Sequence, residues 1–220
     1  MAGPAAPPPR SSAEDFRPIE LAALIFVVCT GFSSQMVMPL WIGAIIDDLS
    51  ISRSAAGMVA SVEFAAVAVV SILVALQVQR FKVLPTAAVG LVLLLLGNFL
   101  AGFADSLNEL ILYRIITGCG KGLVVAIVFS LAAGTRHPTR TFALLNGAYA
   151  LFSMIFYLVV PYFIEWSGAS GAFFMMAGVA ATGTLMLFFF PDRKIEETEL
   201  QQLRLSHLPV FGFIALAALI

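Results

Sequence analysis

Residues 84–103 read LPTAAVGLVLLLLGNFLAGF and contain no Asp, Glu, Lys or Arg. A helix rises about 1.5 Å per residue, so a stretch of this length covers about 30 Å, the thickness of the hydrocarbon core of a bilayer. The composition extends this observation to the whole chain, because 60% of residues are hydrophobic, 11% are charged and the mean hydropathy is +1.00. A soluble domain cannot cover its surface with so few polar residues. The sequence therefore predicts an all-α membrane protein.

Further apolar stretches of similar length lie on both sides of this one. They are continuous rather than alternating, which favours helices over a β-barrel. The predicted spans cover residues 19–46, 55–78, 84–103, 107–133, 141–164 and 171–190. We therefore expect a six-transmembrane-helix bundle over 19–190, and a seventh helix that starts at 208–220 in a chain that looks truncated. Residues 1–18 are expected to form a disordered tail and residues 191–207 a polar linker.

The distribution of Lys and Arg predicts which side of the membrane each connection faces. With the N-terminus in the cytoplasm, the outer connections hold only Arg53, and Arg114 and Lys121 lie within the fourth span. The cytoplasmic side then holds Arg10, Arg17, Arg80, Lys82, Arg136, Arg140, Arg193, Lys194 and Arg204. This bias follows the positive-inside rule. We expect a multi-pass protein of the plasma or inner membrane with a cytoplasmic N-terminus.

Three ionisable residues lie at membrane depth, where each costs several kcal/mol and needs a reason. Glu63 is in the second span, and Arg114 and Lys121 are in the fourth. Their spacing places the two cations about 20° apart on one helix face. Glu63 and Arg114 lie at similar depths, so we expect an ion pair, which either fixes helix packing or takes part in function. Lys121 has no evident carboxylate partner, and we expect it to face a watery cavity, to snorkel or to pair with helix carbonyls.

Polar side chains form stripes on two other spans. The first span carries Thr30, Ser34 and Met38 on one face, with Ser33 and mid-span Gln35 beside them. The fifth span carries Asn146, Tyr149, Ser153 and Tyr157 on one helical face. Such residues either join helices by hydrogen bonds or line a solute pathway, and the sequence leaves both interpretations open. The fourth span also carries glycines that allow close helix packing, namely Gly118, Gly120 and Gly122.

The segment from Arg114 to Gly122, RIITGCGKG, resembles the RxxxGxGxG motif in the fourth helix of major facilitator superfamily transporters. The resemblance covers nearly the whole chain. It implies the N-terminal half of a twelve-helix alternating-access transporter, a 3+3 inverted repeat whose partner is a C-terminal six-helix half. It also implies that Arg114 serves proton coupling or the substrate cavity. Members of this family usually carry a charged signature between helices two and three that latches the cytoplasmic gate. Here Arg80 and Lys82 are what remains of it.

The function predicted from these features is secondary active transport of a small organic solute. The positive charges of Arg114 and Lys121 favour an anionic solute. Glu63, paired with Arg114, is the candidate proton-coupling group of a symporter, and Gln35, Asn146 and Tyr157 are candidate solute contacts together with Tyr149. The alternatives are a proton-driven efflux antiporter for amphiphilic compounds and, in a different class, a seven-helix receptor. We expect no enzymatic activity, cofactor, metal or nucleic-acid partner; the partners are the solute, protons and the lipid bilayer.

Overall fold

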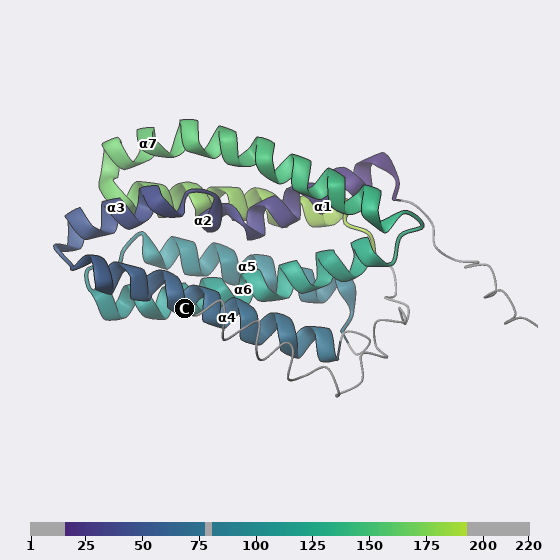
Figure 1. Cartoon of the computed structure of the whole chain (residues 1–220), viewed down its shortest axis with the longest axis horizontal. Coiled ribbons are helices and arrows are strands. Elements are labelled where there is room, and N and C mark those ends of the chain that lie inside the picture. The colour runs from purple at the N-terminus through teal and green to yellow at the C-terminus, as the bar shows by residue number, and fades with distance from the viewer. Residues whose placement is uncertain (1–15, 78–80, 193–220) are drawn as a thin grey trace, which may run out of the picture.

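The chain folds into helices that run along one common direction (Figure 1). The computed structural model describes residues 16–77 and 81–192. The expected seventh helix, most of the tail and linker, and Arg80 lie outside the described residues. The elements are α1 (Pro18–Gly31), α2 (Ser33–Met36), α3 (Met38–Leu49), α4 (Arg53–Leu76), α5 (Val83–Ala101), α6 (Leu107–Ala133), α7 (Pro138–Leu185) and the short 3-10 helix η2 (Met186–Phe189).

Helix starts follow local sequence signals. The hydroxyl of Ser52 accepts a hydrogen bond from the backbone N–H of Ala55, and Ser106 accepts one from Glu109, so a serine caps both α4 and α6. Helices α4, α5 and α6 and the segment Pro138–Phe189 are each long and apolar enough to cross a membrane. The fourth predicted span, 107–133, coincides with α6.

The first predicted span is not one continuous helix. The backbone leaves the helical region at Phe32 (φ −94°, ψ 4°) and again at Val37 (φ −120°, ψ 23°), and this divides the span into α1, α2 and α3. Pro39 explains the second break, because its ring would clash with the carbonyl of Gln35 in a continuous helix. The expectation of a single helix over 19–46 was therefore wrong.

The fifth and sixth predicted spans are the two legs of α7. The backbone is not helical at Ser167 and Gly168, where the chain folds back on itself (Figure 1). Gly168 has φ +60°, a conformation that L side chains rarely adopt. The carboxylate of Asp48, from α3, accepts a hydrogen bond of 2.6 Å from the N–H of Ala169 at the start of the second leg. This contact joins the turn to the end of the first span.

Glycines of α6 allow two neighbouring helices to approach closely. A Cβ atom added at Gly120 would lie 2.5 Å from the carbonyl oxygen of Gly90 on α5, and one added at Gly118 would lie 2.5 Å from that of Glu63 on α4. A Cβ at Gly122 would lie 2.8 Å from Cβ of Val70, also on α4. The three glycines therefore serve two different contacts, and α6 lies between α4 and α5.

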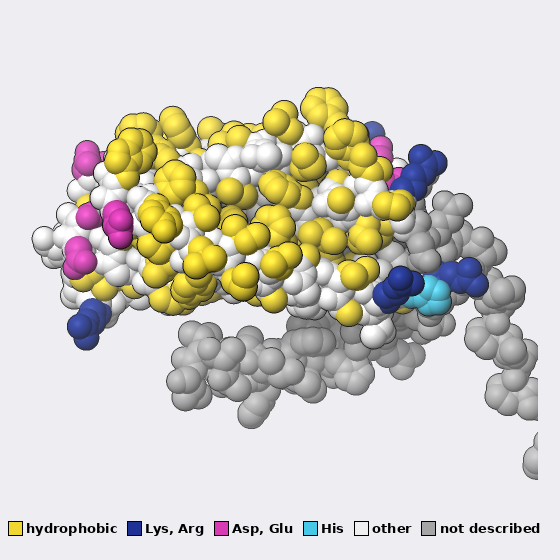
Figure 2. All heavy atoms as spheres, turned by 90° about the horizontal axis from the view of Figure 1, so that it is seen from above, with side chains coloured by type: hydrophobic (Ala, Val, Ile, Leu, Met, Phe, Trp, Pro, Cys, Tyr) yellow, Lys and Arg dark blue, Asp and Glu magenta, His cyan; other side chains and the backbone are white. Residues whose placement is uncertain are grey.

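Charged side chains collect at the two ends of the bundle, and the face shown between them is mainly hydrophobic (Figure 2). We call the end where α1 begins the Phe16 end and the end where α3 finishes the Asp48 end. Among the described residues, the Phe16 end carries Arg17, Lys82, Arg136 and Arg140, with Glu20 and Asp192. The Asp48 end carries Arg53 with Asp47, Asp48, Asp105, Glu109 and Glu165. A hydrophobic surface between two polar ends is typical of an integral membrane protein.

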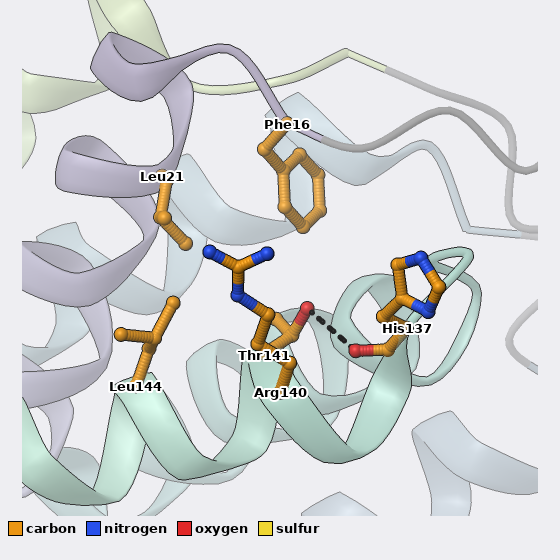
Figure 3. A pocket seen from close by; sticks show the side chains of 6 residues that line it. All are labelled: Phe16, Leu21, His137, Arg140, Thr141 and Leu144. Atoms are coloured by element: carbon orange, nitrogen blue, oxygen red, sulfur yellow. Dashed lines mark hydrogen bonds between the residues drawn. The ribbon is translucent and has the colours of Figure 1, made fainter.

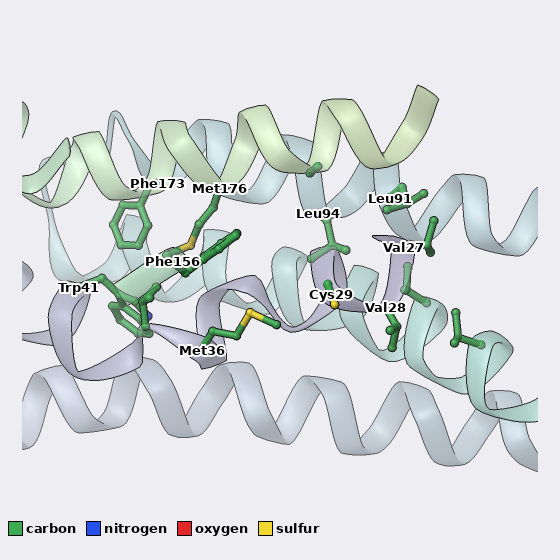
Figure 4. Packing of buried hydrophobic residues seen from close by; sticks show 14 of the residues in the cluster. Val27, Val28, Cys29, Met36, Trp41, Leu91, Leu94, Phe156, Phe173 and Met176 are labelled. Carbon is green, nitrogen blue, oxygen red and sulfur yellow. The ribbon is translucent and has the colours of Figure 1, made fainter. Parts of the chain in front are cut away.

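The apolar core lies where the broken first span meets α5, α6 and both legs of α7. Leu24, Val27 and Val28 of α1 are buried there with Leu91 and Leu94 of α5. Figure 4 shows this packing and, toward the Asp48 end, the aromatic group formed by Trp41, Phe156 and Phe173. The rings of Trp41 and Phe173 are 5.9 Å apart at their centroids. This aromatic group borders the polar site described next.

Candidate functional site

Glu63, Arg114 and Lys121 meet in the interior of the bundle, and we call them the ion cluster. Oε1 of Glu63 lies 2.8 Å from Nζ of Lys121, and Oε2 lies 3.6 Å from Nη1 of Arg114. Their exposed fractions are 3% for Glu63, 0% for Arg114 and 1% for Lys121. The two cations share one face of α6 as expected, and the Glu63–Arg114 contact is present. A single carboxylate on α4 therefore holds two cations of α6.

The expectations for Lys121 were wrong in two respects. It has a carboxylate partner, Glu63, and it is buried rather than facing a watery cavity. The cause is the relative height of the two helices, since the carbonyl of Glu63 lies against Gly118. Gly118 is roughly midway between Arg114 and Lys121 along α6, so the Glu63 side chain reaches both cations.

Other helices complete the surroundings of Arg114. Its Nη2 donates a hydrogen bond of 2.9 Å to Oδ1 of Asn98 on α5, and Nδ2 of Asn98 in turn donates to the carbonyl of Leu94. The guanidinium carbon lies 4.7 Å from the ring centroid of Phe173 and 5.9 Å from that of Trp41. Sequence reasoning missed Asn98 as a site residue. The available signal was that an amide inside an apolar span needs a partner.

Ser34 of α2 belongs to the polar stripe predicted on the first span, although it was not among the residues predicted for the site. Its hydroxyl donates to Oε1 of Glu63 at 2.5 Å and accepts from Nζ of Lys121 at 2.9 Å. The first span therefore touches the ion cluster through a hydroxyl and adds no charge to it. With one carboxylate and two cations, the cluster carries a formal net charge of +1. Nε and Nη1 of Arg114 have no hydrogen-bond partner among the described residues.

A cavity of about 210 Å³ opens beside α2, and we call it the aromatic pocket. The rings of Phe32 and Tyr149 meet edge to face there, 5.6 Å apart at their centroids. Two side-chain amides, those of Gln35 and Asn146, belong to its lining. The lining residues are Val28, Phe32, Gln35, Phe129, Phe142, Leu145, Asn146 and Tyr149.

The aromatic pocket brings together three of the predicted solute contacts: Gln35, Asn146 and Tyr149. The fourth, Tyr157, does not line it and is 45% exposed. Tyr157 shares the helical face of Asn146, but it lies eleven residues further along α7, or about 16 Å at 1.5 Å per residue. Nδ2 of Asn146 donates a hydrogen bond of 2.9 Å to the carbonyl of Phe142 in its own helix.

A second cavity of about 210 Å³ lies at the Phe16 end, between the first turns of α1 and α7. Its lining includes Phe16, Leu21, His137, Arg140 and Leu144, and the guanidinium of Arg140 points into it (Figure 3). This cavity holds no member of the ion cluster. Among the described residues, no three His, Cys, Asp or Glu side chains come together in a way that could hold a metal ion.

These helices and the charged site between them define a polytopic membrane protein with a polar centre at the depth of its spans. The chain belongs to the Major Facilitator Superfamily, whose family model matches residues 23–219. Membership agrees with the motif at Arg114–Gly122.

Two similar proteins show how much of a longer protein this chain covers. "Multidrug efflux pump SdrM" of Staphylococcus aureus (strain N315) is 22% identical over 182 residues, which cover 80% of this chain and 40% of the relative. A crystal structure of a mutant of the peptide transporter POT, in complex with alafosfalin, matches with a TM-score of 0.67 and 14% identity, over 94% of this chain and 47% of that one. The structural likeness shows the fold. The chain spans less than half the length of either protein.

Proposed function

We propose that this chain forms the N-terminal six-helix half of a secondary active transporter, which moves a small organic solute by alternating access and in step with protons. The observation that carries the proposal is the ion cluster, where one buried carboxylate holds Arg114 and Lys121 between α4 and α6. The partner in this proposal is a C-terminal six-helix half of the same protein. The N-terminus is proposed to face the cytoplasm, because the basic Phe16 end would then lie inside.

Glu63 is the proposed proton-accepting group. An ion pair at about 4 Å is worth about 4 kcal/mol at an effective dielectric constant of about 20, so neutralising the carboxylate removes a substantial attraction between α4 and α6. Protonation would raise the formal charge of the cluster from +1 to +2 and leave Arg114 and Lys121 to repel each other. A change of this size is enough to shift a two-state equilibrium between inward- and outward-open forms.

The aromatic pocket is the proposed solute contact of this half, through Gln35, Asn146 and Tyr149. Its walls are mainly aromatic and aliphatic, so it suits the apolar part of an amphiphilic organic molecule. The net positive ion cluster favours a solute that carries a negative charge. A second candidate function, proton-driven export of amphiphilic compounds, is favoured by the same apolar walls and by the similarity to an efflux pump.

Proteoliposomes that contain the full-length transporter test the proposal. Benzoate serves as the anionic probe and ethidium as the amphiphilic cation, and each is followed with and without an imposed pH gradient. We expect Glu63→Gln to abolish accumulation driven by the gradient while exchange across the membrane continues. Glu165→Gln, which neutralises an exposed carboxylate at the Asp48 end, is the matched control and should keep gradient-driven accumulation. Normal pH-driven accumulation by Glu63→Gln would show that Glu63 is not the proton site.

A further inference from the structure

The four residues of α2 lie between the ion cluster and the aromatic pocket. Successive residues of a helix point about 100° apart, so neighbouring side chains of α2 face different parts of the bundle. Ser34 contacts Glu63 and Lys121, whereas Gln35 lines the aromatic pocket together with Phe32, the residue before α2. This short helix therefore touches the proposed proton site and the proposed solute site at once.

Ser34 is held through both its side chain and its backbone. Its hydroxyl bonds Glu63 at 2.5 Å and Lys121 at 2.9 Å, and its carbonyl oxygen accepts a hydrogen bond of 2.8 Å from Nε1 of Trp41. The side chain is 2% exposed, so water does not compete for these bonds. A hydrogen bond to an ionised carboxylate is roughly twice as strong as one between neutral groups. The position of α2 is therefore sensitive to the charge of Glu63.

We propose that Ser34 is a positioning residue that transmits protonation of Glu63 to the aromatic pocket through α2. The inference rests on the proposed function. A hydronium ion from the aqueous phase gives a proton to the carboxylate of Glu63 and leaves as water. The neutral carboxyl is a weaker acceptor than the carboxylate, so the bond from the Ser34 hydroxyl loses strength and α2 is held less firmly. The breaks at Phe32 and Val37 separate α2 from α1 and α3, so it can shift without moving either neighbouring helix as a whole.

Within residues 16–77 and 81–192, the charged groups that face Glu63 all come from α6. They are Arg114 and Lys121. The other helices packed around the ion cluster contribute neutral side chains among the described residues, namely Ser34, Trp41, Asn98 and Phe173. A solute that moves Gln35 or Phe32 would act back through Ser34 on proton binding by the same factor, because coupling between two sites is reciprocal.

Trp41 provides a reporter of α2 that does not require a known solute. Its indole N–H bonds the backbone carbonyl of Ser34, which survives replacement of the side chain. The sequence contains 2 tryptophans, and the other, Trp166, is 80% exposed and can be replaced by Phe. The experiment follows Trp41 fluorescence against pH in a reference protein, the full-length chain with Trp166 and every tryptophan outside residues 1–220 replaced by Phe. The infrared band of the protonated Glu63 carboxyl is followed alongside and is assigned by its loss in Glu63→Gln.

In the reference protein, Trp41 emission should titrate together with the Glu63 band. Ser34→Ala should lose most of the Trp41 response while the Glu63 band still titrates, because the carboxyl binds its proton without displacing α2. The response that remains reports Arg114, whose guanidinium carbon lies 5.9 Å from the Trp41 ring centroid. Ser153→Ala is the matched control: its buried hydroxyl has no hydrogen-bond partner among the described residues, and its removal should leave the Trp41 response intact. If Ser34→Ala does not fold, Ser34→Thr should keep the response and the equally shaped Ser34→Val should lose it.

Two results would overturn the inference, and they are distinct. A full Trp41 titration in Ser34→Ala or Ser34→Val shows that Ser34 transmits nothing, and it leaves Glu63 as the proton site. A Glu63 band that never titrates in the reference protein removes the proton site itself, and the inference falls with it.

Discussion

Replacement of Gly118 by Ala tests whether the close approach of α4 and α6 holds the ion cluster together. The new Cβ would lie 2.5 Å from the carbonyl oxygen of Glu63 and 2.8 Å from Cβ of Ala66, whereas ordinary contact begins at 3.4 Å. Neither obstacle can rotate away, since one is backbone and the other is a methyl group. Helix α4 must therefore move outward by about an ångström, in the range where overpacking costs about 1–3 kcal/mol.

Two further effects set the net magnitude for Gly118→Ala. Alanine is the better helix former by about 1 kcal/mol, which offsets part of the strain. The same outward movement lengthens the 2.8 Å bond between Glu63 and Lys121, which adds to the loss. Strain less the gain in helix propensity leaves a loss of about 0–2 kcal/mol, and the weaker ion pair raises it. We therefore expect the free energy of unfolding to fall by roughly 1–2 kcal/mol.

The assay for Gly118→Ala is reversible unfolding of the purified full-length protein in mixed detergent micelles. Gly178→Ala is the control, since a Cβ at Gly178 meets no atom within 4 Å and should leave stability unchanged or slightly higher. Equal stability of the Gly118 and Gly178 variants would refute the reasoning, because it would mean that α4 and α6 are not held at the distance the structure shows.

Two other contacts give predictions of similar size. Asp48→Ala removes the acceptor for the N–H of Ala169 and should cost about 0.5–2 kcal/mol, as loss of a helix cap does; hydrogen exchange at Ala169 should speed up, and an unchanged rate would argue against the cap. Asn98→Leu leaves Nη2 of Arg114 without its acceptor and should cost about 1–3 kcal/mol in the free energy of unfolding; a variant as stable as the wild type would show that another group replaces the amide.

The sequence alone was sufficient for the features that depend on hydropathy and helical period. The span 107–133 matches α6, and the spacing of Arg114 and Lys121 placed both cations on one face, where the structure has them. These features are properties of a single helix. They require no knowledge of how one helix is placed against the next.

Contacts between helices were less accessible from the sequence. Counting turns from each helix end matched Glu63 with Arg114 and left Lys121 alone, whereas Glu63 lies opposite Gly118 and reaches both cations. The height of α4 against α6 depends on which small residues allow backbones to touch, and a single sequence does not fix that offset. Tyr157 illustrates the same limit, since a helical face says nothing about how far along it a pocket extends.

The broken first span was missed for a different reason, and its consequences join the fold to the site. Hydropathy does not reveal where a helix is interrupted, although Pro39 gave a local signal for the interruption at Val37. A break at membrane depth is tolerated only where protein groups satisfy the freed backbone. The indole of Trp41 does so at the carbonyl of Ser34, and the Ser34 hydroxyl is then directed at Glu63 rather than at its own helix. The irregular segment is thus held in place by the same contacts that connect it to the ion cluster.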